Sequence, residues 1–406
     1  MSGRERTSSP PDSSVPSVPQ AFSRRDFLSA VLLSPIVFTR QSADARFVST
    51  VPIGNPANLP TAPLERLLGA SLDARLFTDL ASIDRVGAGS LITPNDRYYV
   101  RTAYPAPARG KSAWTIPFGG LADPFELTLG AIERGATPAG PYVMECAGNA
   151  DPANFGLLSA ATWSGLLLYD VLAEIRAPSQ KFRVLISGVD DAGPAVTSIP
   201  GASWIFSVDD LQQARLAVGM NGAPLPPDHG APVRLIVPGW YGCACIKWVD
   251  RIDLVPDDAP ATTQMREFAV RTHQPFDSPE ALSSLRAGPA LAREFTPAVI
   301  DTAAMPVRLE KWINAGRVEY RVIGVMWGGA KATNALSIRF KTGGTWTKVD
   351  NCPLPASTQT WSTWTHTWRP SEIGRYQIVL RVDDTSIRTR RLDLFYYARD
   401  TFIDEV

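Results

Sequence analysis

The chain is poor in the residue types that most often carry chemistry in enzymes and metal proteins. Its 406 residues contain four cysteines and three histidines. Four cysteines in a chain of this length do not make a disulfide scaffold, and no C-x-x-C-H segment is present for covalent haem attachment. Three histidines are too few for a metal site of several imidazoles, and no G-x-S-x-G motif accompanies them as in many serine hydrolases.

Net charge and long apolar runs are also missing. Forty basic and forty acidic residues give a formal net charge of zero, which gives no support to binding of nucleic acid or of an anionic membrane. The apolar stretch that ends at Phe38 is about half as long as a helix that crosses a bilayer. By contrast, 35 prolines, 30 glycines and 11 tryptophans favour a β-rich protein with many loops.

The first 45 residues have the features of an export signal. A Ser- and Pro-rich leader, which we expect to be disordered, precedes an arginine pair at positions 24 and 25, the apolar stretch and an A-D-A segment that ends at Ala45. This order resembles a bacterial twin-arginine signal and predicts a periplasmic or otherwise exported protein. The alternatives are an amphipathic helix with a chance arginine pair, or an uncleaved anchor.

The middle of the chain predicts an α+β domain with mixed β-sheets, over residues 46–270. Short strands and turns alternate without the regular βαβ order of a dinucleotide fold, and no Gly-rich phosphate loop is present. We expect strands in residues 97–101, 125–132, 141–148, 181–191, 231–242 and 245–255. We expect helices in residues 64–69, 73–80, 163–175 and 207–214.

The last part of the chain, residues 271–406, predicts a second domain. A Pro- and Ala-rich connector leads to short strands at the spacing of an immunoglobulin-like β-sandwich. The expected strands are residues 307–313, 318–327, 335–349, 359–368, 374–384 and 389–397. No nucleophile or ligand cluster is apparent among them, so we interpret their tryptophans as packing residues.

Polar side chains gather at the ends of the predicted strands of the first domain. The segments are PNDRYYVR, MECAGN, SGVDD, PPDHGAPVR and GCACIKW. They supply the thiol of Cys146 and five ionisable groups, which are Arg101, Asp190, His229, Arg234 and Lys247. Cations from separate loops favour a phosphate-type anion, and a thiolate favours a soft metal. Each residue alone has an ordinary structural interpretation, but together they suggest a phosphorylated, metal-bearing cofactor.

Three of these segments carry a family resemblance. ITPNDRYYVR, MECAGN and MNGAPLPPDHGAPVRLIVPGWYG followed by IKW resemble the sulfite oxidase family of molybdopterin oxidoreductases. The resemblance covers roughly residues 90–256, and the tail resembles that family's immunoglobulin-like dimerisation domain.

The resemblance implies that Cys146 ligates molybdenum and that Arg101 acts beside it in oxygen-atom transfer. A c-type cytochrome or another separate carrier would exchange the electrons, since we expect no haem in this chain. The residues implied to hold the molybdenum cofactor, partly through backbone groups, are Tyr99, Val100, Arg101, Cys146, Asp190, His229, Arg234, Cys245, Ile246 and Lys247.

The expected substrate pocket departs from the family pattern. Sulfite-oxidising members carry an arginine where this chain has Asp151, and a tyrosine where it has Phe268. Arg101 would then be nearly the only anion-binding group, with Asp151 partly neutralising it. The resemblance implies sulfite or a related sulfur compound as substrate. These departures make the pocket less favourable for a sulfite dianion, so a neutral sulfoxide is the alternative.

Two hypotheses from other classes stay open at this stage. One is a cofactor-free secreted binding protein that uses the β-sandwich. The other is a thiol-redox protein that uses the C-x-C pair Cys243 and Cys245. The sequence leaves open whether these cysteines or Cys352 form disulfides, and whether the chain forms a homodimer.

Overall fold

The computed structural model describes most of the chain beyond the expected export signal. The described residues are 45–54, 74–83, 91–102, 114–123, 125–149, 155–175, 180–192, 202–274, 290–341 and 343–406. Apart from Ala45, all of them belong to one compact unit, Arg46–Val406. The expected export signal and the helix expected at residues 64–69 lie outside these ranges.

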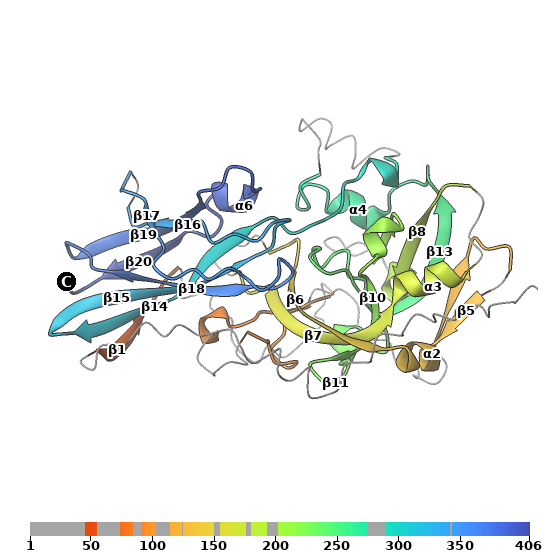
Figure 1. Ribbon diagram of the computed structural model, residues 1–406, viewed down its shortest axis with the longest axis horizontal. Helices are drawn as coiled ribbons and strands as arrows, with labels where there is room; N and C mark the ends of the chain where they lie inside the picture. Colours follow the sequence, from red (N-terminus) through yellow and green to blue (C-terminus); the bar gives the residue numbers. More distant parts are fainter. Residues whose placement is uncertain are drawn as a thin grey trace, which may run out of the picture. The chain divides into compact units, whose positions relative to one another are not determined.

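Two five-stranded sheets form the part of the chain that contains the predicted site segments (Figure 1). The first is antiparallel and consists of β6 (Thr137–Glu145), β7 (Leu158–Leu167), β10 (Arg215–Met220), β11 (Ala223–Pro224) and β12 (Arg234–Ile236). The second consists of β4 (Thr115–Gly119), β5 (Phe125–Thr128), β8 (Phe182–Gly188), β9 (Ser203–Phe206) and β13 (Val249–Pro256). Its β4–β13 pair is parallel and its other pairs are antiparallel, so the prediction of mixed sheets is confirmed.

Two four-stranded sheets form the C-terminal part (Figure 1). One contains β1 (Arg46–Val51), β14 (Ala303–Asn314), β15 (Arg317–Trp327) and β18 (Ser362–Trp368). The other contains β16 (Leu336–Arg339), β17 (Thr347–Lys348), β19 (Gly374–Val382) and β20 (Arg399–Ile403). Inward-facing residues of both sheets, such as Val322 and Ile378, belong to the same apolar cluster, so the sheets share a core. The edge strand β1 comes from the start of the described chain, which the sequence did not predict to contain a strand.

The helices of the described residues are short. They are α2 (Leu129–Arg134), α3 (Leu168–Glu174), α4 (Thr263–Glu267) and α6 (Arg390–Asp393), with 3-10 turns at Leu80–Ser82, Val189–Ala192, Asp209–Leu211, Pro227–His229 and Ala292–Glu294. The described part of the chain is therefore mostly β with few helices, and its helical content is lower than the predicted α+β class implied. No helix among these residues is long and apolar enough to cross a membrane.

Several local predictions were wrong. The strand expected in residues 125–132 ends at Thr128, and helix α2 begins at Leu129. The helix expected from residue 163 is strand β7 up to Leu167, because β7 pairs with β6 on one side and β10 on the other. Residues 74–76, expected to be helical, form strand β2 (Ala74–Leu76), which pairs with β3 (Val100–Thr102). Residues 207–214 contain only a 3-10 turn, and residues 389–397 contain helix α6 in place of a strand.

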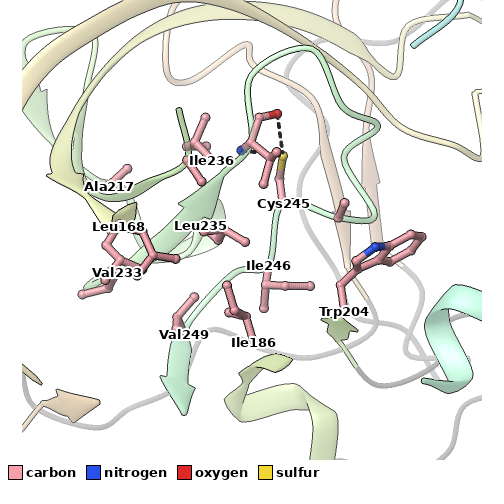
Figure 2. Packing of buried hydrophobic residues seen from close by; sticks show 14 of the residues in the cluster. Leu168, Ile186, Trp204, Ala217, Val233, Leu235, Ile236, Cys245, Ile246 and Val249 are labelled. Atoms are coloured by element: carbon pink, nitrogen blue, oxygen red, sulfur yellow. Dashed lines mark hydrogen bonds between the residues drawn. The ribbon is translucent and has the colours of Figure 1, made fainter. Parts of the chain in front are cut away.

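Strand β6 lies between two apolar cores, which we call the first core and the second core. The first core lies between the two five-stranded sheets. Figure 2 shows part of it, including Leu235, Ile236, Ile246 and Trp204. The second core belongs mainly to the C-terminal sheets. Successive side chains of a strand point to opposite faces. Accordingly, Met144 and Cys146 belong to the first core, whereas Val143 and Ala147 belong to the second. The polypeptide at the end of β6 is thus held from both sides.

Candidate functional site

Cys146 lies directly after β6, at the start of a tight turn. Its N–H donates to Leu157 O at 3.0 Å, and its carbonyl accepts from Asn149 N at 2.8 Å. The N–H of Gly148 donates to its Sγ at 3.3 Å. Burial raises the pKa of the Cys146 thiol, while the Gly148 N–H and the positive charges of Arg101 and Arg391 act in the opposite direction. A bound cation would convert this buried thiol to the thiolate that a soft metal prefers.

Two arginines lie on the side of the turn that carries the thiol. Arg101 is on β3 and is partly exposed, and its charge acts on the pKa of Cys146. A Cβ atom built on Gly148 would lie 3.5 Å from Cys146 Sγ and 3.9 Å from Nη1 of Arg271. The thiol and the Arg271 guanidinium therefore border the same small space. Arg271 follows α4 in a turn and was not predicted as a site residue, because nothing in its local sequence distinguishes it from a surface arginine.

Four of the predicted residues, Asp190, His229, Arg234 and Lys247, lie together with two residues that the sequence analysis did not predict, Tyr98 and Trp163. We call these six residues the aromatic–basic cluster. The ring of Tyr98 packs edge-on against the rings of Trp163 and His229, with centroids 6.0 and 5.4 Å apart. The guanidinium of Arg234 lies 5.3 Å from the centroid of the Trp163 ring. Arg234 also donates to His229 O at 2.9 Å and to Cys245 O at 3.1 Å.

His229 is a neutral imidazole within this cluster. The pKa of His229 is lowered to about 4, and the main cause is burial. The charges of Arg234 and Lys247 contribute in the same direction, whereas the hydrogen bond with Asn95 raises this pKa. Its Nε2 lies 2.9 Å from the carbonyl oxygen of Asn95. A carbonyl only accepts hydrogen bonds, so Nε2 carries the proton and Nδ1 is an acceptor.

Lys247 and Asp190 lie at the edge of the cluster, where the charge of each acts on the other, and Lys247 Nζ donates to Asp228 O at 3.4 Å. Burial lowers the pKa of Lys247 to about 8 and raises the pKa of Asp190 to about 6, while each charge opposes the shift of the other. Gly230 permits this arrangement, because it has a φ of +109° and a Cβ there would lie 2.9 Å from Arg234 Cβ and 3.1 Å from Lys247 Cβ. The His229–Gly230 turn can therefore press against both basic residues.

The residues expected to act through their backbone are buried beside this cluster, and several of those groups already have protein partners. Tyr99 N donates to Ser159 Oγ at 3.0 Å. Cys245 O accepts from Arg234, and Ile246 O accepts from Leu235 N at 2.7 Å. Val100 is buried in β3. Cys245 Sγ accepts a hydrogen bond from Val237 N at 3.4 Å within the first core (Figure 2). All four cysteines are free, so the disulfides left open by the sequence are not formed and Cys243 and Cys245 are unlinked.

The two residues expected to change the substrate pocket have different outcomes. Asp151 lies outside the described residues. Phe268 is buried in the second core, and the guanidinium of Arg271 lies 5.4 Å from its ring centroid. Arg271 is the charged residue of the 268–271 segment, and its guanidinium borders the Cys146 turn.

No motif in the sequence indicated the charged network on the other face of β6. Glu145 is 1% exposed and receives hydrogen bonds from Asn149, Trp327, Arg391 and Tyr397. We call these five residues the Glu145 network. Its C-terminal members come from β15 and from the segment at α6, where the sequence predicted a strand with no functional residue.

The aromatic–basic cluster fits a polar heterocyclic cofactor with a phosphate. Tyr98 Oη, Trp163 Nε1 and Arg234 Nε are buried and have no hydrogen-bond partner among the described residues, and the same holds for Asp190 Oδ1. Buried polar atoms are normally paired, so such a concentration points to a ligand with its own donors and acceptors. The described residues contain no group of three His, Cys, Asp or Glu side chains that could hold a metal ion. A metal at Cys146 would therefore take its other ligands from a cofactor.

Comparison with known proteins agrees with this chemistry. Residues 103–263 match the family described as oxidoreductase molybdopterin binding domain. The chain is 27% identical to mitochondrial sulfite oxidase of Homo sapiens over 265 residues, which cover 59% of this chain and 48% of that protein. It is 28% identical to sulfite oxidase of Gallus gallus over 326 residues, covering 74% and 68%. The chain contains an oxidoreductase molybdopterin binding domain and is similar to the sulfite oxidases. It spans about half the length of the mammalian sulfite oxidases that it matches.

Other members and a solved structure broaden the comparison. Nitrate reductase (NAD(P)H) of Hordeum vulgare is 30% identical over 212 residues, which cover 48% of this chain and 24% of that protein. The fold also matches the crystal structure of the sulfane dehydrogenase SoxCD from Paracoccus pantotrophus, with a TM-score of 0.58 at 18% identity, covering 88% of this chain and 89% of that one. The family resemblance and the molybdenum cofactor predicted from the sequence are thereby confirmed. The cofactor-free binding protein does not agree with them.

Proposed function

We propose that this chain catalyses oxygen-atom transfer to or from a small sulfur compound, with Cys146 as the protein ligand of molybdenum. When bound, the cofactor supplies a metal that changes oxidation state by two electrons. The observation that carries the proposal is the placement of Cys146. Its thiol lies at the end of β6, bordered by the Arg271 guanidinium and within reach of the charge of Arg101.

The aromatic–basic cluster would hold the pterin part of the cofactor. The unpaired atoms of Tyr98, Trp163 and Arg234 are suited to a polar heterocycle. Lys247 is suited to the phosphate, because an anion beside it would offset the burial that lowers its pKa. Neutral His229 would accept a hydrogen bond through Nδ1 without adding a charge.

Sulfite is the substrate that the charges favour. Its oxidation to sulfate takes an oxygen atom from water and releases two electrons and two protons. Arg101 and Arg271 provide positive charge beside the thiol, and guanidinium groups bind oxyanions well. Arg271 therefore supplies part of the positive charge that this chain lacks by carrying Asp151 where sulfite-oxidising members carry an arginine.

A charge test separates sulfite from the neutral sulfoxide alternative. Arg271→Gln should raise KM for sulfite by about 10-fold, because a charged hydrogen bond of this kind contributes about 1.5 kcal/mol or more. The same variant should leave turnover of a neutral sulfoxide almost unchanged. Fast sulfoxide turnover with no detectable sulfite oxidation in the unaltered enzyme would reverse the assignment.

Replacement of the proposed ligand tests the cofactor site itself. Cys146→Ser should keep the fold, because the side chain changes little in size, and should lower activity by more than about 100-fold, beyond the loss typical for residues around a metal ligand. Elemental analysis should give about one molybdenum per chain in the unaltered protein. Full activity in Cys146→Ser would contradict the proposed ligand.

The remaining predictions concern where the enzyme works and with what. The arginine pair and apolar stretch of the first 45 residues support export through the twin-arginine route to the periplasm. The absence of a C-x-x-C-H segment from the sequence supports a separate c-type cytochrome as electron carrier. The two C-terminal sheets with their shared core support an immunoglobulin-like domain that forms a homodimer. Measuring the secretion of a variant with two lysines in place of the arginine pair tests export. Reduction of cytochrome c by the enzyme tests the electron carrier. Light scattering tests the homodimer.

A further inference from the structure

The side chain of Glu145 is anchored to the C-terminal part of the chain. Its Oε1 accepts from Arg391 Nη1 at 2.8 Å, from Tyr397 Oη at 3.2 Å and from Asn149 Nδ2 at 3.2 Å. Its Oε2 accepts from Trp327 Nε1 at 3.0 Å. A carboxylate with this many donors is fixed in both position and orientation. The residue before the proposed metal ligand thus has almost no freedom to move.

Arg391 also holds the backbone on the far side of Cys146. Its Nη1 donates to Asn149 O at 3.2 Å, and its Nη2 donates to Ala147 O at 3.0 Å and to Arg271 O at 3.2 Å. Its guanidinium lies 5.0 Å from the centroid of the Tyr241 ring. One planar group therefore binds the residue before Cys146, the residue after it and the segment that carries Arg271.

The strand geometry converts this anchorage into a position for the thiol. Neighbouring side chains at the end of β6 point to opposite faces, with Ala147 in the second core and Cys146 in the first. Holding Glu145 on one face sets the direction in which Cys146 points on the other. A purely structural buried ion pair is weak grounds for stability, since apolar residues of similar volume often serve as well. A role in positioning Cys146 would explain why Glu145 and Arg391 form a buried ion pair at the end of β6.

We propose that Arg391, acting through Glu145 and the turn carbonyls, is a positioning residue that orients Cys146 toward molybdenum. The inference rests on the proposed role of Cys146 as the metal ligand. It makes the C-terminal region a part of the metal site, although Arg391 itself touches neither the thiol nor the substrate. The alternative is that Arg391 only stabilises the contact between β6 and the C-terminal sheets.

Arg308 provides a matched control for these two alternatives. It is a buried arginine of the same C-terminal region, it pairs with Glu310 at 2.7 Å, and it donates to Ala81 O and Ile83 O at 2.8 Å each. Both arginines thus combine a buried ion pair with backbone carbonyls. Arg308 has no recorded contact with the Cys146 turn among the described residues, so Arg308→Met reports the structural loss alone.

The experiment compares Arg391→Met, Arg391→Lys and Arg308→Met as holoenzymes at neutral pH. It measures molybdenum per folded chain during dialysis, the absorption band from thiolate-to-molybdenum charge transfer, and kcat and KM with sulfite. We expect Arg391→Met to lose molybdenum about 10-fold faster than Arg308→Met, with a weakened band, because changes around metal ligands typically have 10- to 100-fold effects. kcat should fall while KM stays within about 2-fold, and Arg391→Lys should lie between, since lysine keeps the charge but not the fork of donors.

The outcomes separate this inference from the proposed function. If Arg391→Met and Arg308→Met lose similar stability and both keep the molybdenum and band of the unaltered enzyme, Arg391 is structural only. If Arg391→Met does not accumulate as folded protein, Arg391→Lys decides on the same measurements. An unaltered enzyme without molybdenum, or a Cys146→Ser variant with an intact band, contradicts the proposed ligand and not the contacts of Arg391.

Discussion

The aromatic–basic cluster and the Glu145 network are both buried and charged, but they use their polar atoms differently. In the cluster, Tyr98 Oη, Trp163 Nε1 and Arg234 Nε have no hydrogen-bond partner among the described residues. In the network, Glu145 accepts from four side chains and Arg391 donates to four oxygen atoms. The two groups lie on opposite faces of the same strand end.

The difference distinguishes a binding site from a support. A folded chain normally pairs its buried polar atoms, so unpaired atoms gathered in one place indicate a ligand that completes them. Polar atoms that are fully paired gain nothing from a ligand, but they define one arrangement of the backbone. The cofactor site that we propose for this chain thus consists of a part that would bind the cofactor and a part that holds the Cys146 turn in place. Substitutions should affect the two parts in opposite ways.

The largest expected effect on stability comes from breaking the Glu145 network. Glu145→Leu removes the partner of Arg391 and leaves a buried positive charge uncompensated, which typically costs about 3–5 kcal/mol. Urea denaturation of the cofactor-free protein should show this loss in the free energy of unfolding. A loss below about 1 kcal/mol would mean that water reaches Arg391, and the network would then not act as a rigid support.

An intermediate effect is expected from the pH dependence of the aromatic–basic cluster. Between pH 3.8 and about 6, folded Asp190 keeps a proton that the unfolded carboxyl loses, so the free energy of unfolding falls as pH rises. Between about pH 8 and 10.5, folded Lys247 has lost a proton that the unfolded amine keeps, so the free energy of unfolding rises with pH. The cofactor-free protein should therefore carry a penalty of about 1–3 kcal/mol from this pair between pH 6 and 8.

Urea denaturation across this pH range tests the penalty. The control is the double variant Asp190→Asn with Lys247→Met, which removes both titrating groups. The stability of the unaltered protein minus that of the control should have its minimum between pH 6 and 8. Bound cofactor should make the minimum shallower, because its phosphate compensates Lys247. A difference that does not vary with pH contradicts the shifted pKa values of the pair.

The smallest effect is expected for Tyr98→Phe, which is compared with the matched variant Tyr397→Phe. Tyr397→Phe removes a hydroxyl bonded to Glu145 and should destabilise the cofactor-free protein by about 1.5–3 kcal/mol. Tyr98→Phe removes a hydroxyl that has no protein partner in the described part of the chain, so stability should stay the same or rise by about 1 kcal/mol. Thermal unfolding with and without cofactor measures both, and only Tyr98→Phe should weaken cofactor binding directly. Equal losses in the two cofactor-free variants would remove the distinction between the two regions.

The sequence was informative where local pattern decides the structure. The segment PYVMECAG was expected to be a strand, and β6 ends at Glu145 with Cys146 directly after it. The prediction failed at residues 163–167, because an apolar run such as Gly165 to Leu168 suits a helix or a buried strand equally well. Pairing of β7 with both β6 and β10 decided in favour of the strand.

The support of the site could not be predicted, for a different reason. Arg391 and Glu145 are 246 residues apart in the chain, and neither belongs to a motif that indicates their contact. The alternating pattern of residues 389–397 also suggested a strand, whereas the segment forms α6 and turns that bury Arg391. Cationic loop residues such as Arg234 and Lys247 could be identified because their chemistry is visible in short segments.

The edge strand β1 has a consequence for the time course of folding. It pairs Arg46 with Ile313 and Val51 with Leu309, and Ile53 forms a bridge with Thr401 of β20. The first described strand can therefore pair only after residues in the last third of the chain have been synthesised. At about 5–20 residues per second, a ribosome needs on the order of ten seconds or more to make them. During synthesis residues 46–51 have no partner strand until β14 has been made, so this edge of the sheet can form only late.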